Sequence, residues 1–204
     1  MVEMKRYRKP TSLRPPKTLS KEEQTRLLAF VAGSGHRRDS ALLSLALGSG
    51  LRLMEVVGLD VGHVARKGGE VAWRIDLPKG ITKHGRGGVA FLTERVKAEL
   101  ALFLAWKRDA GQSLDRRAPL FLSSQRRRIG TRRAQALFQE WQRRAGFEEI
   151  YTFHHLRHTA ITNVYRATKD LFLAQRFARH ANPITTVIYT HPSDEEIYSA
   201  IAGI

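Results

Sequence analysis

Four features of this sequence hold residues that could do chemistry. In chain order they are Arg52 after the glycine-rich break at 48–50, Lys83 in a turn-rich basic stretch, the run His-His-Leu-Arg-His at 154–158, and His180 with Tyr189 nine residues later. An isolated arginine or lysine in a basic chain is usually a solvated surface residue. An isolated tyrosine at an apolar helical position usually packs in a core. Taken singly, the four features therefore indicate no activity.

A metal site is the first activity that the histidines suggest. His154 and His158 are four residues apart, so on a helix they share one face, as a pair of zinc ligands does. No glutamate lies inside the pair, no third ligand stands out, and Arg157 between them would repel a cation. The chain also lacks cysteine, a Gly-x-Ser-x-Gly elbow and a P-loop, so nothing indicates thiol chemistry, a triad hydrolase or ATP use. We expect no metal and no nucleotide cofactor.

The elements that must position these residues are mostly helices. Apolar spacing and a capping box at Ser20 and Glu23 predict helices from residue 20 and over 39–47, 51–59, 96–111, 131–145, 155–165, 169–179 and 185–190, with a last one from Ser193. Two strands, 71–77 and 89–93, flank the basic tip that carries Lys83, and residues 119–122 are a short strand or a buried connection. The predicted fold is one mainly α domain with a small antiparallel β element (α+β).

The charge of the chain indicates a polyanionic partner. Its 204 residues include 35 Lys and Arg against 19 Asp and Glu, a net charge of +16, and its 42% hydrophobic content is enough for a folded core. The sequence shows no run of about 18 apolar residues and no signal peptide, so we expect no membrane partner. Double-stranded DNA is the expected partner, and a cytoplasmic, DNA-associated location follows from it.

In order and spacing, the four features resemble the catalytic domain of the tyrosine recombinase (phage integrase) family. Residues 49–56 match the family's first arginine box, Thr-Gly-Leu-Arg-x-x-Glu-Leu, and residues 154–158 match its His-x-x-Arg-His box. Lys83 stands eight residues before Phe91-Leu92, where the family has Pro-Leu. Residues 178–180 and Tyr189 match the Leu-Gly-His box and its following tyrosine. The resemblance spans about residues 19–200 and implies the fold of that catalytic domain.

The resemblance implies catalytic roles for Arg52, Lys83, His154, Arg157, His180 and Tyr189. Fixed guanidiniums suit the charge that develops on the non-bridging oxygens of a phosphodiester, and a histidine can complete that cradle. Clustered positive charge and a nearby imidazole favour the phenolate of a tyrosine, whose ordinary pKa is about 10. By resemblance, the lysine protonates the leaving 5′ oxygen. The tyrosine forms a 3′-phosphotyrosine that allows the strands to be rejoined without a cofactor.

Further basic residues are expected to contact DNA phosphates. They are Lys5, Arg6, Arg8 and Lys9 in an N-terminal arm, Arg86 on the hairpin, Arg126, Arg127, Arg128, Arg132 and Arg133 around the helix start at Thr131, and Arg179. A solvated surface is the alternative interpretation. Arg179 stands where the family usually has glycine, so it either contacts phosphate or crowds the tyrosine helix. Thr152-Phe153 stands where the family usually has a proline before the histidine.

The expected domains are a basic arm at 1–17 and a catalytic domain at 18–204, with no separate core-binding domain. A natural minimal recombinase, a fragment, and a protein whose DNA clamp is supplied by an accessory protein all stay open. We expect self-association on DNA, from dimer to tetramer. The last helix, 193–204, packs on its own domain or is exchanged between protomers.

The expected activity is site-specific DNA recombination or integration. Two alternatives stay open. A type IB topoisomerase resembles this family in fold and in its reacting residues, but it relaxes supercoils as a monomer. A non-catalytic DNA-binding or regulatory protein on the same scaffold would lack a reacting residue.

Overall fold

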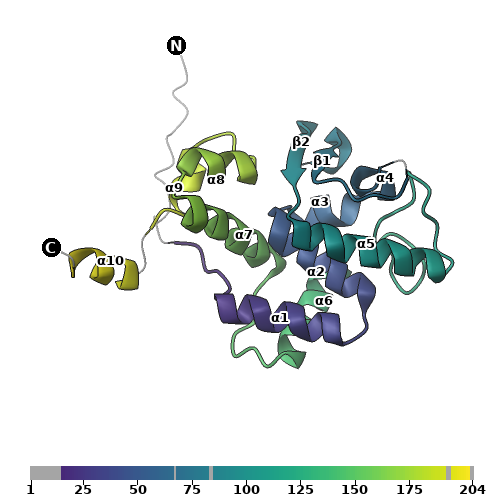
Figure 1. Cartoon of the computed structure of the whole chain (residues 1–204), viewed down its shortest axis with the longest axis horizontal. Coiled ribbons are helices and arrows are strands. Elements are labelled where there is room, and N and C mark those ends of the chain that lie inside the picture. Colours follow the sequence, from purple (N-terminus) through teal and green to yellow (C-terminus); the bar gives the residue numbers. More distant parts are fainter. Residues whose placement is uncertain (1–14, 67, 83–84, 192–193, 203–204) are drawn as a thin grey trace, which may run out of the picture.

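The computed structural model describes residues 15–66, 68–82, 85–191 and 194–202, and the predicted class is confirmed (Figure 1). The elements are α1 (Lys21–Gly33), α2 (Arg37–Ser49), α3 (Leu53–Gly58), α4 (Val61–Val64), β1 (Arg74–Leu77), a 3-10 turn (Lys79–Ile81), β2 (Gly88–Phe91), α5 (Glu94–Asp109), α6 (Thr131–Arg144), α7 (Phe153–Thr168), α8 (Leu171–Ala178), α9 (Ile184–Val187) and α10 (Asp194–Ile201). Helices therefore dominate, as the apolar spacing predicts.

Side-chain caps fix where the first helices begin. The Ser20 hydroxyl accepts the Glu23 N–H at 3.1 Å, and the Glu23 carboxylate accepts the Ser20 N–H at 2.8 Å, so the predicted capping box is confirmed. Thr93 caps α5 by accepting the N–H of Val96 at 3.3 Å. The second predicted capping box starts at Ser193, which lies outside the described residues.

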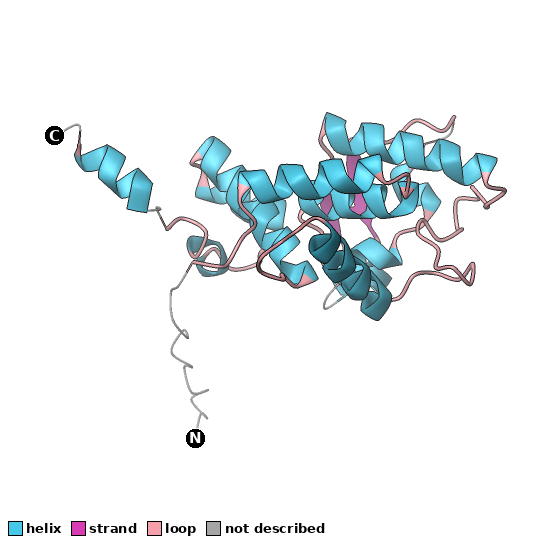
Figure 2. Ribbon diagram, turned by 90° about the horizontal axis from the view of Figure 1, so that it is seen from below, coloured by secondary structure: helices cyan, strands magenta, loops and turns pink. Residues whose placement is uncertain are grey.

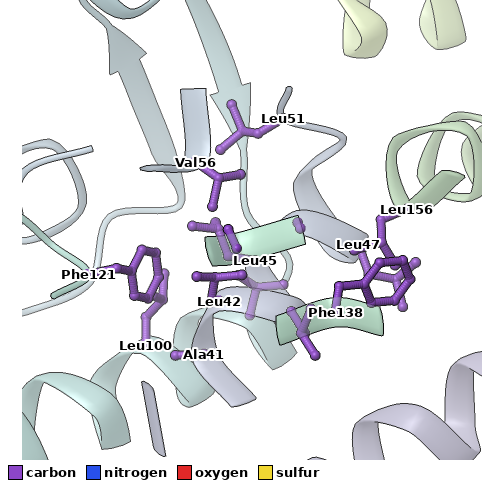
Figure 3. Close-up of a cluster of buried hydrophobic side chains, with 14 of the residues drawn as sticks. Ala41, Leu42, Leu45, Leu47, Leu51, Val56, Leu100, Phe121, Phe138 and Leu156 are labelled. Carbon is purple, nitrogen blue, oxygen red and sulfur yellow. The ribbon is translucent and has the colours of Figure 1, made fainter. Parts of the chain in front are cut away.

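Helix α2 is the centre of the fold. Its side chains from 39 to 47 are all buried, and α1, α5 and α7 pack around it. We call the continuous buried cluster that surrounds α2 the main core. Figure 3 shows part of it, with labelled side chains from α2 and from the elements that cover it: Ala41, Leu42, Leu45, Leu47, Leu51, Val56, Leu100, Phe121, Phe138 and Leu156. Full burial of each large apolar side chain contributes about 2 kcal/mol, so this core is a stable base for the site.

The small sheet is a hairpin. β1 and β2 pair antiparallel with Arg74 opposite Phe91 and Leu77 opposite Gly88. Both strands are shorter than predicted. Val71 makes only an isolated bridge to Ala65, and Thr93 is already the N-cap of α5. Residues 119–122 form a buried connection with isolated bridges and belong to no strand.

A second, smaller cluster lies where α7, α8 and α9 meet. Its buried members are Ile161, Ala174, Ala178 and Tyr189, and we call these four the tyrosine cluster. Beyond it, α10 stands apart from the body of the molecule in both views (Figures 1 and 2). Its side chains Ile197, Tyr198 and Ile201 are exposed. The tyrosine cluster is thus much smaller than the main core, and Val164, Tyr165, Phe177 and Ile188 pack against it as partly buried neighbours.

Candidate active site

Arg52 is positioned by the junction between α2 and α3. Gly50 ends α2 with φ +61, a left-handed conformation that favours glycine. A Cβ on Gly50 would lie 2.8 Å from a ring carbon of Phe177, so the junction also needs glycine for its close contact with α8. Arg52 itself is extended and precedes the first residue of α3. The break in the helix therefore turns the Arg52 side chain out of the main core and leaves it half-buried.

Glu55 holds Arg52 in place. Its carboxylate is 1% exposed and accepts the Arg52 backbone N–H at 2.7 Å and the Arg52 Nη1 at 3.1 Å. The same carboxylate accepts Nη2 of Arg179 at 2.6 Å. One buried carboxylate is thus shared by two guanidiniums. Charge-assisted bonds of this kind fix the orientation of a guanidinium.

Arg157 ties α2 to α8. It lies on α7 with 2% exposure and donates one N–H to the carbonyl of Gly50 and another to the carbonyl of Ala178. Burial, together with the positive charges of Arg52 and Arg179, lowers its pKa to about 9. The guanidinium is still charged at pH 7. Because two of its five N–H groups are used by these carbonyls, the others are available to an anion.

Tyr189 is 5% exposed and its phenol contacts a histidine. The distance from the Tyr189 oxygen to Nδ1 of His158 is 2.7 Å. Burial raises the pKa of Tyr189 to about 12, although the charges of Arg157 and Arg52 act in the opposite direction. Burial and the neighbouring His154, His155, Arg157 and His180 lower the pKa of His158 to about 4. The imidazole is therefore neutral at pH 7, and in its Nε2–H tautomer Nδ1 accepts the phenol proton.

His180 also lies against the Tyr189 ring. It comes directly after Arg179, the C-cap of α8, and its ring stacks on that of Tyr189 with centroids 6.1 Å apart and planes at 25°. Its Nδ1 is 2.9 Å from the hydroxyl of Thr186. Burial, followed by Arg157, Arg52 and Arg179, lowers the pKa of His180 to about 4. A neutral imidazole of this kind can donate a hydrogen bond to an oxyanion.

The remaining predicted catalytic residues lie at or beyond the edge of this group. His154 is exposed on α7, and its ring meets that of His158 edge to face with centroids 4.4 Å apart. Lys83 lies outside the described residues. The structure thus brings Arg52, Arg157, His180 and Tyr189 close enough together for the two arginines to act on the pKa values of both other side chains.

Neither a metal cluster nor a membrane segment occurs in the part of the chain that the structure describes. In those ranges no three His, Cys, Asp or Glu side chains are grouped so that they could hold a metal ion. No described helix combines the length and the apolar character needed to cross a bilayer.

The basic residues predicted to contact DNA fall into three groups. Arg86, Arg126, Arg127, Arg132 and Arg133 are exposed on the surface. Arg128 donates to the carbonyls of Val57 and Leu59 and to the carboxylate of Asp60, at 3.2, 2.9 and 2.5 Å, so it also holds α3 to the α6 start. Arg179 is bound to Glu55, as described above. The arm residues Lys5, Arg6, Arg8 and Lys9 lie outside the described residues.

Sequence reasoning missed two residues of this group. Glu55 lies in the matched first arginine box, where no role is assigned to it. It stands three residues after Arg52, at the position where a glutamate caps the start of a helix, and this spacing is the signal that could have identified it. His158 was considered only as a metal ligand. Its contact with Tyr189 joins residues 31 positions apart, and no periodicity in the sequence indicates such a contact.

This arrangement has the parts needed to attack a phosphodiester. Two fixed guanidiniums can neutralise developing charge on phosphate oxygens, a neutral imidazole can take a proton from a phenol, and the phenol can act as the nucleophile. The His158 imidazole and the Tyr189 phenol are already at hydrogen-bond distance.

Comparisons with known proteins agree with this geometry. The phage integrase family matches residues 17–196. The chain is 37% identical over 181 residues to tyrosine recombinase XerC of Serratia marcescens, which covers 86% of this chain and 55% of that protein. The chain thus spans about half the length of the curated relatives it matches.

Solved structures show the same fold. The crystal structure of XerA recombinase matches with a TM-score of 0.76 and 25% identity, covering 93% of this chain and 65% of that one. XerH site-specific recombinase, bound to its difH substrate in a pre-cleavage complex, matches with a TM-score of 0.71 and 20% identity, covering 97% and 57%.

Proposed function

Because the chain belongs to the phage integrase family, we propose that it is a site-specific recombinase that cleaves and rejoins double-stranded DNA through a 3′-phosphotyrosine on Tyr189. The observation that carries this proposal is the 2.7 Å contact between the Tyr189 phenol and His158, beside Arg157 and Arg52. A tyrosine buried for packing alone does not need two guanidiniums and two imidazoles around its ring.

The cleavage step uses these residues as follows. The phenolic oxygen of Tyr189 bonds to phosphorus while its proton passes to Nδ1 of His158. Arg52 and Arg157 neutralise the charge on the non-bridging oxygens, and His180 donates to one of them. The bond from phosphorus to the 5′ oxygen breaks, and that oxygen takes a proton, which we assign to Lys83 by resemblance. Rejoining is the reverse reaction with a 5′ hydroxyl of another strand, so the bond energy is conserved and no nucleotide is consumed.

A covalent trap tests the proposal. A DNA substrate with a nick beside the cleavage point loses its short 5′ fragment after attack, so the adduct accumulates on a denaturing gel. We expect an adduct with the wild-type protein in EDTA and none with Tyr189→Phe. Tyr165→Phe, which changes a half-buried tyrosine of α7, is the matched control and keeps the adduct. An adduct on Tyr189→Phe would contradict the choice of nucleophile, and a strict need for a divalent ion would contradict the mechanism.

The same trap separates the alternatives. A non-catalytic DNA-binding protein yields no adduct with any substrate. A type IB topoisomerase yields the adduct and also relaxes supercoiled plasmid at protein concentrations where it is a monomer. A recombinase exchanges strands between two sites only when it self-associates on DNA. Exchange of labelled strands between two duplexes therefore decides between the two enzymes.

We further propose that self-association uses α10. Ile197, Tyr198 and Ile201 are exposed on this helix, and α8 presents exposed Phe172 and Leu173 on the body of the molecule. An apolar helix face and an apolar surface on the same chain can pair between two copies, each burying the face of the other. We expect Ile201→Asp to remove cooperativity from DNA binding in a gel-shift assay. Unchanged cooperativity would assign α10 to its own domain or to another partner, such as an accessory protein that completes the DNA clamp.

DNA binding is assigned to the exposed arginines at the α6 start and to Arg86, with the N-terminal arm as a further contact. The N-terminus of α6 has no side-chain cap, so its backbone N–H groups are open to phosphate. We expect the double variant Arg132→Ala, Arg133→Ala to bind all DNA sequences equally more weakly. The slope of log K against log[salt] should fall in magnitude by about 2.

A further inference from the structure

The backbone at Arg179 is strained. Arg179 follows α8 with φ +56, in the left-handed region that a residue with a side chain rarely adopts. Glycine would adopt this conformation without strain. Strained residues persist where the surrounding structure holds them, and they are most frequent at functional sites. The arginine at this position therefore needs a compensating interaction.

The side chain of Arg179 is built into the site. It is 11% exposed and its Nη2 donates to Glu55 at 2.6 Å. Its aliphatic stem lies against β2: a Cβ added to Gly88 would stand 3.0 Å from Cδ of Arg179. The hairpin thus leaves room for this side chain by having glycine at that register position. Arg179 thus connects three elements: it follows α8, its stem packs against β2, and its guanidinium binds Glu55 in α3.

The group has an excess of positive charge. Arg52, Arg157 and Arg179 give 3 − 1 = +2 against the one carboxylate of Glu55, and Arg157, Arg179 and Glu55 are largely buried. Like charges removed from water repel strongly. Burial is the main reason why the pKa of Arg179 is lowered, with Arg52 adding to it and Glu55 opposing it. The excess charge is relieved when an anion enters.

One donor of this group is incomplete. Nη1 of Arg179 is buried and has no hydrogen-bond partner among the described residues. Buried donors are almost always paired, so an orphan of this kind calls for an explanation. Together with the excess charge, it indicates that the group is completed by an anionic ligand.

We propose that Arg179 is a positioning residue for the cleavage step, which holds Glu55 together with Arg52 and adds positive charge beside the scissile phosphate. Through Glu55, Arg179 fixes the guanidinium of Arg52, and its own charge offsets that of the carboxylate. Without Arg179, Glu55 would neutralise Arg52 alone and weaken its attraction for phosphate. This inference rests on the proposed function, since it concerns the same phosphodiester.

The test compares two substrates and four proteins. The substrates carry either a normal phosphodiester or a methylphosphonate at the scissile position, where a methyl group replaces one non-bridging oxygen and removes the charge. The proteins are wild type, Arg179→Gly, Arg179→Lys and Lys169→Gly. Lys169 is the matched control, because it is also a cation with a left-handed φ, +53, at the end of the neighbouring helix α7. Single-turnover cleavage is measured at saturating DNA, and Kd is measured separately.

We expect Arg179→Gly to lower the cleavage rate constant about 30-fold on the phosphodiester while Kd changes less than about 3-fold. Its melting temperature changes little, since the glycine relieves strain while the bond to Glu55 is lost. On the neutral methylphosphonate the deficit shrinks to less than about 3-fold, and Arg179→Lys recovers part of the rate on the phosphodiester. Lys169→Gly cleaves like wild type.

Two results would overturn the inference. Arg179→Gly cleaving the phosphodiester at the wild-type rate would mean that Arg179 has no part in the step. An equal loss on both substrates would mean that the residue acts only through folding or packing. If wild type itself forms no adduct, the proposed function has failed instead, so the two failures are distinguishable.

Discussion

The main core and the tyrosine cluster hold opposite halves of the site, and they are packed very differently. The main core surrounds α2 on all sides with fully buried leucine and phenylalanine side chains. The tyrosine cluster has four buried members, two of which are alanines, and its outer face exposes Phe172 and Leu173. Arg52 is fixed by the first region and Tyr189 by the second. Local stability follows buried apolar contact, so we expect the half that holds Arg52 to be rigid and the half that holds Tyr189 to open more readily.

Arg157 is the tie between the two regions, because it donates to Gly50 at the end of α2 and to Ala178 at the end of α8. This pairing has a functional consequence. Under the proposed function, the densely packed half holds Arg52 against the phosphate. The thinly packed half holds Tyr189, which stays bonded to the 3′ phosphate while the 5′ ends exchange.

The largest effect is expected from Arg157→Met. Cleavage should fall about 10³-fold, about 4 kcal/mol of barrier, because a donor to the developing charge is lost. Hydrogen exchange in α8 should become faster than in the wild type, since the hydrogen bond from Arg157 to Ala178 is removed. Arg108→Met, on an exposed arginine of α5, is the charge-matched control and should change neither quantity. An α8 exchange rate equal to that of the wild type would contradict the connecting role of Arg157.

The next effect separates the regions by stability. Leu45 and Ile161 are both fully buried, one in the main core and one in the tyrosine cluster. Leu45→Ala should lower the free energy of unfolding by about 3 kcal/mol in a denaturant titration. Ile161→Ala should cost about 2 kcal/mol, because the thinner cluster collapses around the cavity, and the change should appear in the hydrogen exchange of α8 first. If Ile161→Ala were the more costly change, the two regions would be one cooperative core.

The contrast between the main core and the tyrosine cluster also explains which features can be predicted from the sequence. The main core follows local rules: the Ser20 cap, the apolar period of α5 and α6 and the break at Gly50 all lie where the pattern predicts them. The tyrosine cluster does not. α9 is a single turn at Ile184–Val187, while the pattern predicts a helix over 185–190, since so short an element is fixed by tertiary contacts. The contact between His158 and Tyr189 likewise joins distant segments, so the spacing of residues in the sequence does not predict it.

Predictions made from the family boxes also have a physical limit. The boxes identify Arg52, Arg157, His180 and Tyr189, and the structure brings these four together. The arginine at 179 interrupts one box, and the sequence leaves open whether it contacts phosphate or crowds the tyrosine helix. Its guanidinium binds Glu55, a buried carboxylate 124 residues away that Arg52 also binds. Only the fold decides which of two plausible partners a long side chain reaches.

A smaller effect is expected from pH. Burial lowers the pKa of His158 and of His180 from 6.5 to about 4, so below pH 6.5 the unfolded chain binds protons that the folded chain does not. Stability is therefore complete above pH 6.5 and falls as the pH approaches 4. Each histidine contributes on the order of 1 kcal/mol once solvent screening of these partly buried groups is allowed for. His158→Asn should flatten the decline in melting temperature between pH 7 and pH 4.5. Identical declines in variant and wild type would show that His158 is not held neutral.

The smallest effect on folding is expected at the outer face of the tyrosine cluster. Phe172 is 72% exposed, so Phe172→Ser should change the free energy of unfolding by less than about 0.5 kcal/mol. If that face receives α10 of a second copy, the same change should weaken self-association on DNA about 10-fold, measured by analytical ultracentrifugation of the DNA complexes. Leu102→Ser, at a 51% exposed leucine of α5 over the main core, is the matched control and should leave assembly unchanged. An equal loss of self-association in both variants would mean that any apolar-to-polar change on the surface weakens assembly. The face around Phe172 would then not be the one that receives α10.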